Sequence, residues 1–224
     1  MKLESNASIL LLQQNRSMKI TAISPFNTAR PRSIVELVSE IDSGLVILPG
    51  YADNIPSVAA IQKHLKPGVF VFLESAGKEQ SKPWFVSREQ TILMPAQVFG
   101  RNPRAQELRD LETCFPKRTF PLVDRQVSFI LCGEINAFQP DGSTKKGIEL
   151  PFDVLINPAH SRMGRWNVLD PKLTALSKGR VVIHVANNTT GSQRLTTDVR
   201  IYANGEKVGN REEKADAVCM SYEV

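Results

Sequence analysis

Five nearly continuous apolar runs constrain the fold of this chain more than any other feature. They are LVIL at residues 45–48, VFVFL at 69–73, ILC at 130–132, FDVLI at 152–156 and VVIHV at 181–185. A strand with one solvated face alternates apolar and polar residues, whereas these runs are nearly continuous and rich in β-branched and aromatic side chains. They therefore predict strands that are covered on both faces.

A helix is expected between the first two strands. After a strand at 18–24, Pro31 is followed by Ser33 and Glu36, which have the spacing of a capping box. An apolar stripe follows, and Gly44 is suited to end the helix. The start of the chain thus predicts a strand, a helix and a second strand.

The later segments add two helices and a hairpin. One helix is expected from Pro56 to residues 67–68, and Asp170 is expected to cap another that has Pro171 at its first position. Asn204 and Gly205 form a strong hairpin signal. Strands that alternate with helices in this way predict an α/β fold with partly parallel strands.

Composition indicates one large globular unit. The 224 residues are 42% hydrophobic and 23% charged, which suits a single substantial core. We expect one domain over residues 18–224, preceded by a lead-in at 1–17. The net charge is +5, but Lys and Arg are interspersed with Asp and Glu, which favours a solvated surface over a nucleic-acid interface.

Several classes of protein are disfavoured by the motifs. Three cysteines without CxxC spacing suggest neither a disulfide framework nor a zinc site, and they favour a reducing, cytoplasmic setting. The apolar segment at 8–12 is too short to cross a bilayer. No glycine-rich phosphate loop or HExxH motif is found, so no cofactor or metal is expected.

Cys132 stands where a nucleophile would be placed. It ends the apolar run within VSFILCGE, residues 127–134, and is followed by Gly133 and Glu134. In open α/β sheets ligands bind at the carboxyl ends of strands, which makes Cys132 a candidate active-site cysteine. The structural alternative is a free cysteine that serves as a small buried hydrophobic residue.

Taken in order, these segments resemble the carbon–nitrogen hydrolase (nitrilase) superfamily. Residues 130–135, ILCGEI, are similar to the family's strand and nucleophilic cysteine, and residues 152–159, FDVLINPA, to the strand that follows. The resemblance covers nearly the whole chain from Met18. It implies a four-layer αββα sandwich of two mixed sheets, a small amide-like substrate and assembly into a homodimer.

By the same resemblance, catalysis would use a glutamate, a lysine and a cysteine. Cys132 matches the cysteine, and Gly133 would supply a backbone amide to the oxyanion. Gly50, followed by Tyr51 in the expected pocket, stands where the family has its glutamate. Residues 93–98 contain no lysine at the place where the family has one. Two of the three catalytic positions therefore depart from the family pattern.

Four side chains are candidate replacements for the missing groups. Lys117 precedes the cysteine in a basic loop, Asp53 and Glu134 are possible proton acceptors, and His160 can act as acid or base near neutral pH. Asn187, after a buried strand, is a candidate for the pocket mouth. The structural alternatives are a cap or surface role for the carboxylates and a hydrogen-bonded structural role for His160.

Two functions are consistent with this pattern. The first is a hydrolase of a small amide or other non-peptide C–N bond, with a cysteine nucleophile and rebuilt partners. The second is a catalytically impaired protein of the same fold that acts as a binding or assembly module. Because a reactive thiolate needs a positive charge beside it, the surroundings of the Cys132 sulfur separate the two.

Overall fold

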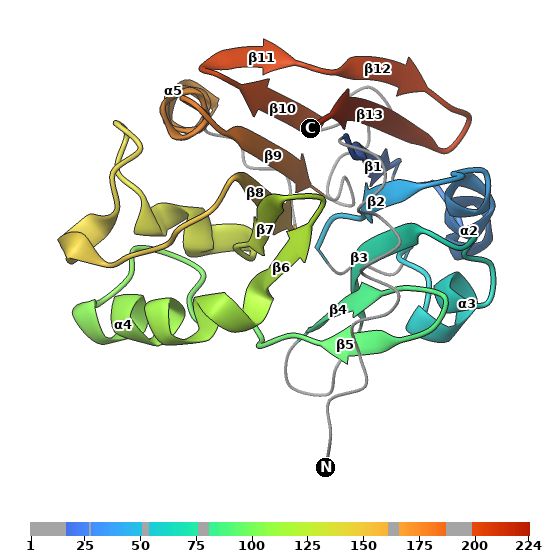
Figure 1. Ribbon diagram of the computed structural model, residues 1–224, viewed down its shortest axis with the longest axis horizontal. Helices are drawn as coiled ribbons and strands as arrows, with labels where there is room; N and C mark the ends of the chain where they lie inside the picture. Colours follow the sequence, from blue (N-terminus) through green and yellow to red (C-terminus); the bar gives the residue numbers. More distant parts are fainter. Residues whose placement is uncertain (1–16, 27, 51–53, 76–80, 161–165, 187–198) are drawn as a thin grey trace.

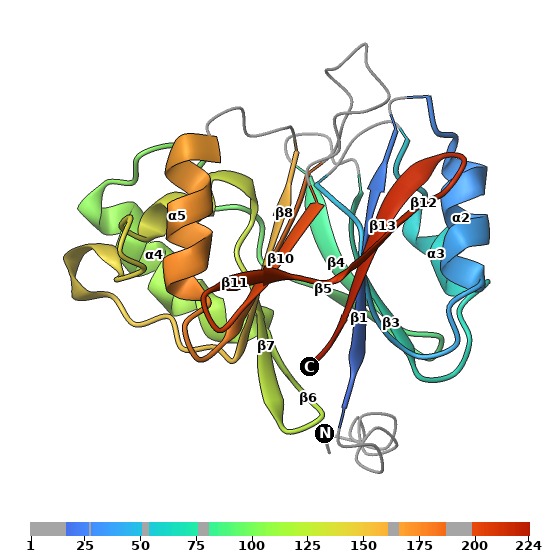
Figure 2. The same cartoon turned by 90° about the horizontal axis from the view of Figure 1, so that it is seen from above.

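The computed structural model describes residues 17–26, 28–50, 54–75, 81–160, 166–186 and 199–224. Two β-sheets lie face to face, with helices on both outer sides (Figures 1 and 2). The first sheet has seven strands in the order β12-β13-β1-β2-β3-β4-β5. Its strands are β1 (Lys19–Pro25), β2 (Gly44–Ile47), β3 (Val69–Ser75), β4 (Lys82–Val86), β5 (Thr91–Leu93), β12 (Asn210–Glu213) and β13 (Ala217–Glu223). Its outer side is covered by α2 (Pro31–Ser39) and α3 (Val58–Gln62).

The second sheet has six strands in the order β11-β10-β9-β8-β7-β6. They are β6 (Thr119–Leu122), β7 (Arg125–Phe129), β8 (Val154–Ala159), β9 (Val181–Ala186), β10 (Val199–Ala203) and β11 (Glu206–Val208). The helices on its outer side are α4 (Ala105–Cys114) and α5 (Trp166–Leu176), as Figure 2 shows. The described residues of this half also include the 3₁₀ helices η2 (Phe115–Arg118), η3 (Cys132–Ala137) and η4 (Lys145–Gly147).

Each sheet is built around three parallel strands. In the first sheet β1, β2 and β3 are parallel, and in the second β7, β8 and β9 are parallel, while the flanking strands pair antiparallel. Helices α2, α3 and α5 connect successive parallel strands, and β7 is connected to β8 through η3 and η4. The predicted αββα sandwich of two mixed sheets is confirmed.

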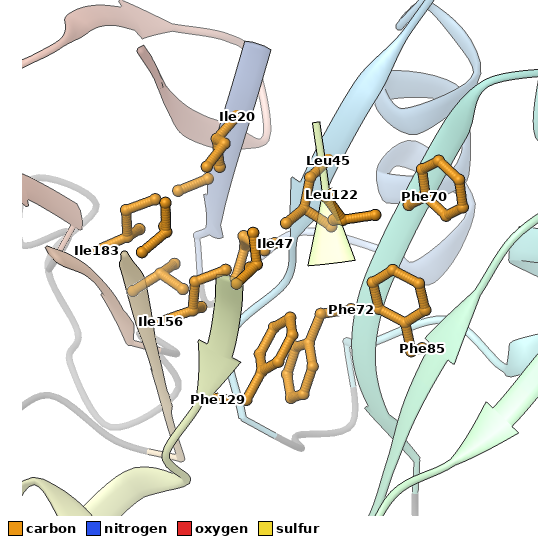
Figure 3. Packing of buried hydrophobic residues seen from close by; sticks show 14 of the residues in the cluster. Ile20, Leu45, Ile47, Phe70, Phe72, Phe85, Leu122, Phe129, Ile156 and Ile183 are labelled. Carbon is orange, nitrogen blue, oxygen red and sulfur yellow. The ribbon is translucent and has the colours of Figure 1, made fainter. Parts of the chain in front are cut away.

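The continuous apolar runs arise because each strand contributes to two cores. On β2, Leu45 and Ile47 point between the sheets, whereas Val46 packs toward α2 and α3. Between the sheets, Phe72 of β3 stacks on Phe129 of β7 with ring centroids 5.0 Å apart (Figure 3). The prediction of strands covered on both faces is therefore confirmed for β2, β3, β8 and β9, whereas it is wrong for ILC at 130–132, because β7 ends at Phe129 and η3 begins at Cys132.

Two predicted helix starts are wrong. Helix α2 begins at Pro31, with Arg30 as an N-cap residue that makes no side-chain cap, so Ser33 lies within the first turn. The fixed φ of proline and its missing N–H suit the first helical position itself. Asp170 lies inside α5 rather than at its start, and its carboxylate binds Arg200 and Tyr202 of β10. A tertiary contact has replaced the predicted cap.

Helix α3 is shorter than expected. It ends at Gln62, and turns occupy most of the predicted second half of the helix. Ser57 caps its start by accepting a hydrogen bond from the Ala60 amide at 3.2 Å. The hairpin prediction is confirmed, since Asn204 and Gly205 both have positive φ, 54° and 84°, between β10 and β11. Within the described ranges, no helix has the length and apolar character needed to cross a membrane.

Candidate active site

The two sheets meet directly at the carboxyl ends of their parallel strands. The Gly50 amide, after β2, donates to the carbonyl of Ala159 on β8 at 2.9 Å. The Ser24 hydroxyl of β1 donates to the carbonyl of Ala186 on β9 at 2.9 Å. Because side chains that follow these strands converge here, this edge is where polar groups from both sheets can act together.

Cys132 sits in a strained turn just beyond β7. Its φ is 40°, in the left-handed region that side-chain-bearing residues rarely adopt. The next residue must be glycine, because a Cβ on Gly133 would lie 2.1 Å from the carbonyl oxygen of Gly100. The turn therefore brings the half-buried thiol to the edge of the sheet and packs its backbone against the segment at 95–100.

Beside the thiol lies a histidine that is itself held by a carboxylate. His160 follows β8, and its Nε2 lies 2.6 Å from Oε2 of Glu74 on β3 of the opposite sheet. A hydrogen bond with the Cys132 side chain, followed by that with Glu74, raises the pKa of His160 to about 10 against the opposing effect of burial. The ring is therefore an imidazolium at neutral pH. Thiol, imidazole and carboxylate form a connected series across the two sheets.

Gly50 provides the space for this imidazole. A Cβ at position 50 would lie 2.4 Å from Cδ2 of His160 and 2.6 Å from its backbone nitrogen. Any side chain at this position would therefore displace the histidine or the strand end that carries it. The absence of a carboxylate at position 50 and the presence of His160 are thus parts of one arrangement.

Glu134 belongs to a buried ion pair beneath the site. Its Oε2 lies 2.5 Å from Nη1 of Arg118, and both side chains are fully buried. The same carboxylate accepts hydrogen bonds from the amides of Val98 at 2.6 Å and Leu131 at 2.7 Å. Burial raises the pKa of Glu134, against the effect of Arg118 and these amides. Both oxygens are committed to holding the loops on either side of the thiol.

A cavity of about 320 Å³ opens next to His160. It is lined by Ser81, Gln97, Val98, Phe99, Gly100 and His160. The Ser81 hydroxyl lies 3.4 Å from both Glu74 Oε1 and His160 Nε2, and the Gln97 amide donates to the Phe99 carbonyl at 2.7 Å. In the part of the chain that the structure describes, no three His, Cys, Asp or Glu side chains are arranged to hold a metal ion.

The structure brings some of the candidate residues together and leaves others apart. Cys132, Gly133, Gly50 and His160 come together at the sheet edge. Lys117 is exposed on η2, and the cation buried in this region is its neighbour Arg118. Tyr51, Asp53 and Asn187 lie outside the described residues.

Glu74 and Gln97 were not singled out from the sequence. Glu74 directly follows VFVFL at the carboxyl end of a parallel strand, so the rule that selected Cys132 also applies to it. Gln97 lies in the segment 93–98, where the family resemblance implies a lysine, and its side-chain amide is a neutral donor.

Comparison with known proteins identifies the fold. No protein-family model and no curated protein matches the sequence. Among solved structures, a CN-hydrolase superfamily protein from Xanthomonas campestris, with an arsenic adduct in its active site, has a TM-score of 0.59 and 13% identity over 93% of this chain and 90% of that chain.

Two further solved structures have a similar fold. An amidase from Nesterenkonia sp. has a TM-score of 0.59 and 13% identity over 92% of this chain and 90% of that one. A glutamine-dependent NAD(+) synthetase from Cytophaga hutchinsonii has a TM-score of 0.57 and 11% identity over 93% of this chain and 43% of that one. One structure of the Nesterenkonia amidase carries the acetamide moiety of fluoroacetamide on its active-site cysteine. The chain described here thus has the fold of the carbon–nitrogen hydrolase (nitrilase) superfamily.

Proposed function

We propose that this protein hydrolyses a small carboxamide or a related non-peptide C–N bond, with Cys132 as nucleophile, His160 as acid and base, and Glu74 as the group that orients His160. The observation that carries the proposal is the series of contacts from thiol to imidazole to carboxylate. In this proposal the His160 imidazole and the Glu74 carboxylate replace the glutamate and lysine that the family resemblance led us to expect. Lys117, Asp53 and Glu134 are then not needed for proton transfer.

The first half of the reaction forms a thioester. The imidazolium of His160 stabilises the Cys132 thiolate, which attacks the carbonyl carbon while the C=O electron pair moves onto oxygen. As the tetrahedral intermediate collapses, His160 gives its proton to the amide nitrogen and the C–N bond breaks. The amine leaves, and the acyl group remains on the Cys132 sulfur.

The second half releases the acid. The neutral His160 takes a proton from water, whose oxygen attacks the thioester carbon. The C–S bond breaks, the carboxylic acid leaves, and the thiolate–imidazolium pair is restored. Throughout, the Glu74 carboxylate fixes the ring orientation and stabilises its positive charge.

The oxyanion is assigned to two donors, of which the Gln97 side chain lines the cavity. The Gly133 amide follows the nucleophile, and the Gln97 carboxamide stands in the stretch where the resemblance led us to expect a lysine. A neutral donor can stabilise an oxyanion when it is positioned before the reaction, since no reorganisation is then needed.

Thiol labelling tests the nucleophile independently of any substrate. Burial raises the pKa of Cys114, and it raises the pKa of Cys219 to about 11, so both should react slowly with iodoacetamide at pH 7. Cys132 should react faster than both, and His160→Gln should remove that advantage. If Cys132 reacts no faster than the other two, the protein is better described as a non-catalytic binding or assembly module.

Turnover is tested with a panel of small amides. Butyramide and acrylamide are suitable first members, because variants of the Nesterenkonia amidase have been crystallised with them. Release of ammonia should be abolished by Cys132→Ala and unchanged by Cys219→Ala on β13. Ammonia release that persists in Cys132→Ala would exclude a cysteine mechanism.

The proposal includes a homodimer in a reducing, cytoplasmic compartment. The three cysteines are free in the structure, and a nucleophilic thiol must stay reduced to act.

An isologous interface between two copies would bury apolar residues of the outer layers, among them Val168 of α5, which is 51% exposed. Light scattering at micromolar concentration should report twice the mass of one chain, and a monomer would contradict the dimer.

A further inference from the structure

A buried polar pair lies directly beneath the strained cysteine. Asn157 on β8 and His184 on β9 are direct partners in the parallel register, and both side chains are fully buried. They follow Leu155 and Val182 by two residues on the same face, which packs against the layer of α4 and α5. Polar groups at such positions are costly unless they are hydrogen-bonded, so their contacts need an explanation.

The Asn157 amide spans the turn that carries the thiol. Its Nδ2 donates to the carbonyl of Ile130 at 2.9 Å and to the carbonyl of Cys132 at 3.0 Å. The two carbonyls lie on either side of Leu131, whose own amide is bound by Glu134. The backbone on both sides of the left-handed residue is therefore tied down by buried side chains.

His184 fixes which way the Asn157 amide points. Its Nδ1 lies 2.8 Å from Asn157 Oδ1. Because both hydrogens of the Asn157 amide go to carbonyls, Oδ1 must accept, and the His184 proton is on Nδ1. Burial and then Arg200 lower the pKa of His184 to about 3, which keeps the ring neutral and its donor in place.

We propose that Asn157 and His184 are positioning residues: the imidazole orients the amide, and the amide holds Cys132 in its left-handed conformation so that the thiol meets His160. Without the two bonds to Asn157, the Cys132 backbone could relax to negative φ, which an L-residue prefers. The thiol would then leave the imidazolium. The effect on turnover rests on the proposed function, but the effect on the backbone does not.

The first experiment is the crystal structure and labelling rate of Asn157→Leu, a change of similar shape that removes both donors. We expect Cys132 φ to become negative, and iodoacetamide labelling of Cys132 at pH 7 to slow by about tenfold, as for the loss of one or two net hydrogen bonds. Ser128→Ala is the matched control, because Ser128 is buried on β7 and its hydroxyl pairs with Thr119 at 2.9 Å. It should lose stability without changing labelling.

If Asn157→Leu does not fold, the variants His184→Asn and His184→Leu test the same positioning role. His184→Asn places an amide donor near the position of Nδ1 and should keep labelling within about twofold of the wild type, whereas His184→Leu should slow it by about tenfold. Midpoints of thermal unfolding are measured for both, so that a general loss of stability is recognised.

Two results would overturn the positioning role. One is a Cys132 that keeps its positive φ in Asn157→Leu or His184→Leu, and the other is labelling that falls equally in Ser128→Ala. Should wild-type Cys132 label as slowly as Cys114 and Cys219, the proposed function fails on its own, and Cys132 φ in the variant structures still decides the role of Asn157.

Discussion

His160 and His184 come from neighbouring strands of one sheet, yet their surroundings are opposite. His160 stands at the end of β8 beside a thiol and a carboxylate, with a side chain that is 33% exposed, and it carries a proton. His184 lies inside β9 beside an amide, fully buried, and it is neutral. The comparison shows that the charge of a histidine here is set by its partners and its burial: Cys132 and then Glu74 raise the pKa of His160, whereas burial lowers the pKa of His184.

The largest effect is expected from His160→Ala. Loss of a general acid and base lowers turnover by about 10²–10⁴-fold. His64→Ala is the control, since His64 is exposed and its Nδ1 lies 2.9 Å from the carbonyl of Ala60, within its own segment. Both variants are assayed with an amide that the wild type hydrolyses. Equal rates for the two variants would contradict the assignment of His160 as acid and base.

Gly50→Ala should have the next largest effect. The new Cβ collides with His160, and a misplacement of about 1 Å at a reacting group can cost about 10²-fold in rate. Gly68→Ala is a useful comparison because a Cβ there meets open space, while its φ of 79° strains the backbone. It should lower the unfolding midpoint and leave turnover unchanged. Wild-type turnover in Gly50→Ala would mean that His160 is not the proton carrier.

The pH dependence of stability should differ in sign for the two histidines. The pKa of His160 is raised to about 10, so its contribution is complete below pH 6.5 and is lost as the pH rises toward 10. The pKa of His184 is lowered to about 3, so its contribution is complete above pH 6.5 and is lost as the pH falls toward 3.

Urea unfolding of the wild type, His160→Gln and His184→Gln between pH 4 and 9 measures these contributions to the free energy of unfolding. Each group can change the free energy of unfolding by at most about 1.4 kcal/mol per pH unit, and His160 by less because solvent screens it. His184→Gln should flatten the acid side of the profile, and His160→Gln the alkaline side. The same change in both variants would show that the two environments are not distinct.

Ser81→Ala should have the smallest effect. Its hydroxyl is 3.4 Å from both Glu74 and His160, long for a hydrogen bond, so a loss of about twofold in turnover is expected. A loss of a hundredfold would instead indicate that Ser81 contacts the substrate or acts as the nucleophile. Mass spectrometry of the trapped acyl-enzyme distinguishes these, because the acyl group would then be found on Ser81.

Much of the framework follows from local sequence pattern. The five apolar runs predict strands with two covered faces, and the strand-end rule identifies Cys132. The same rule could have identified Glu74. It could not have shown that Glu74 meets His160, which is 86 residues away and in the other sheet.

Distant contacts override local preference at two residues. Asp170 has the position expected of a cap, but it binds Arg200 and Tyr202 on β10 instead. Glu134 has the position expected of a proton acceptor, but Arg118 and two amides occupy its carboxylate. In both cases a residue type suited to a local role is used by a partner that the local sequence does not reveal.

The sequence by itself determined where most of the strands lie, that they are buried on both faces, and that a cysteine follows one of them. Those properties depend on periodicity and propensity, which act over a few residues. Only the tertiary structure decided that Gly50 leaves space for the imidazole of His160 and that Glu74 binds this imidazole. It also decided that Asn157 hydrogen-bonds the turn that carries the thiol. These contacts form where two sheets meet, so they depend on how separate strands pack and not on the order of residues within any one of them.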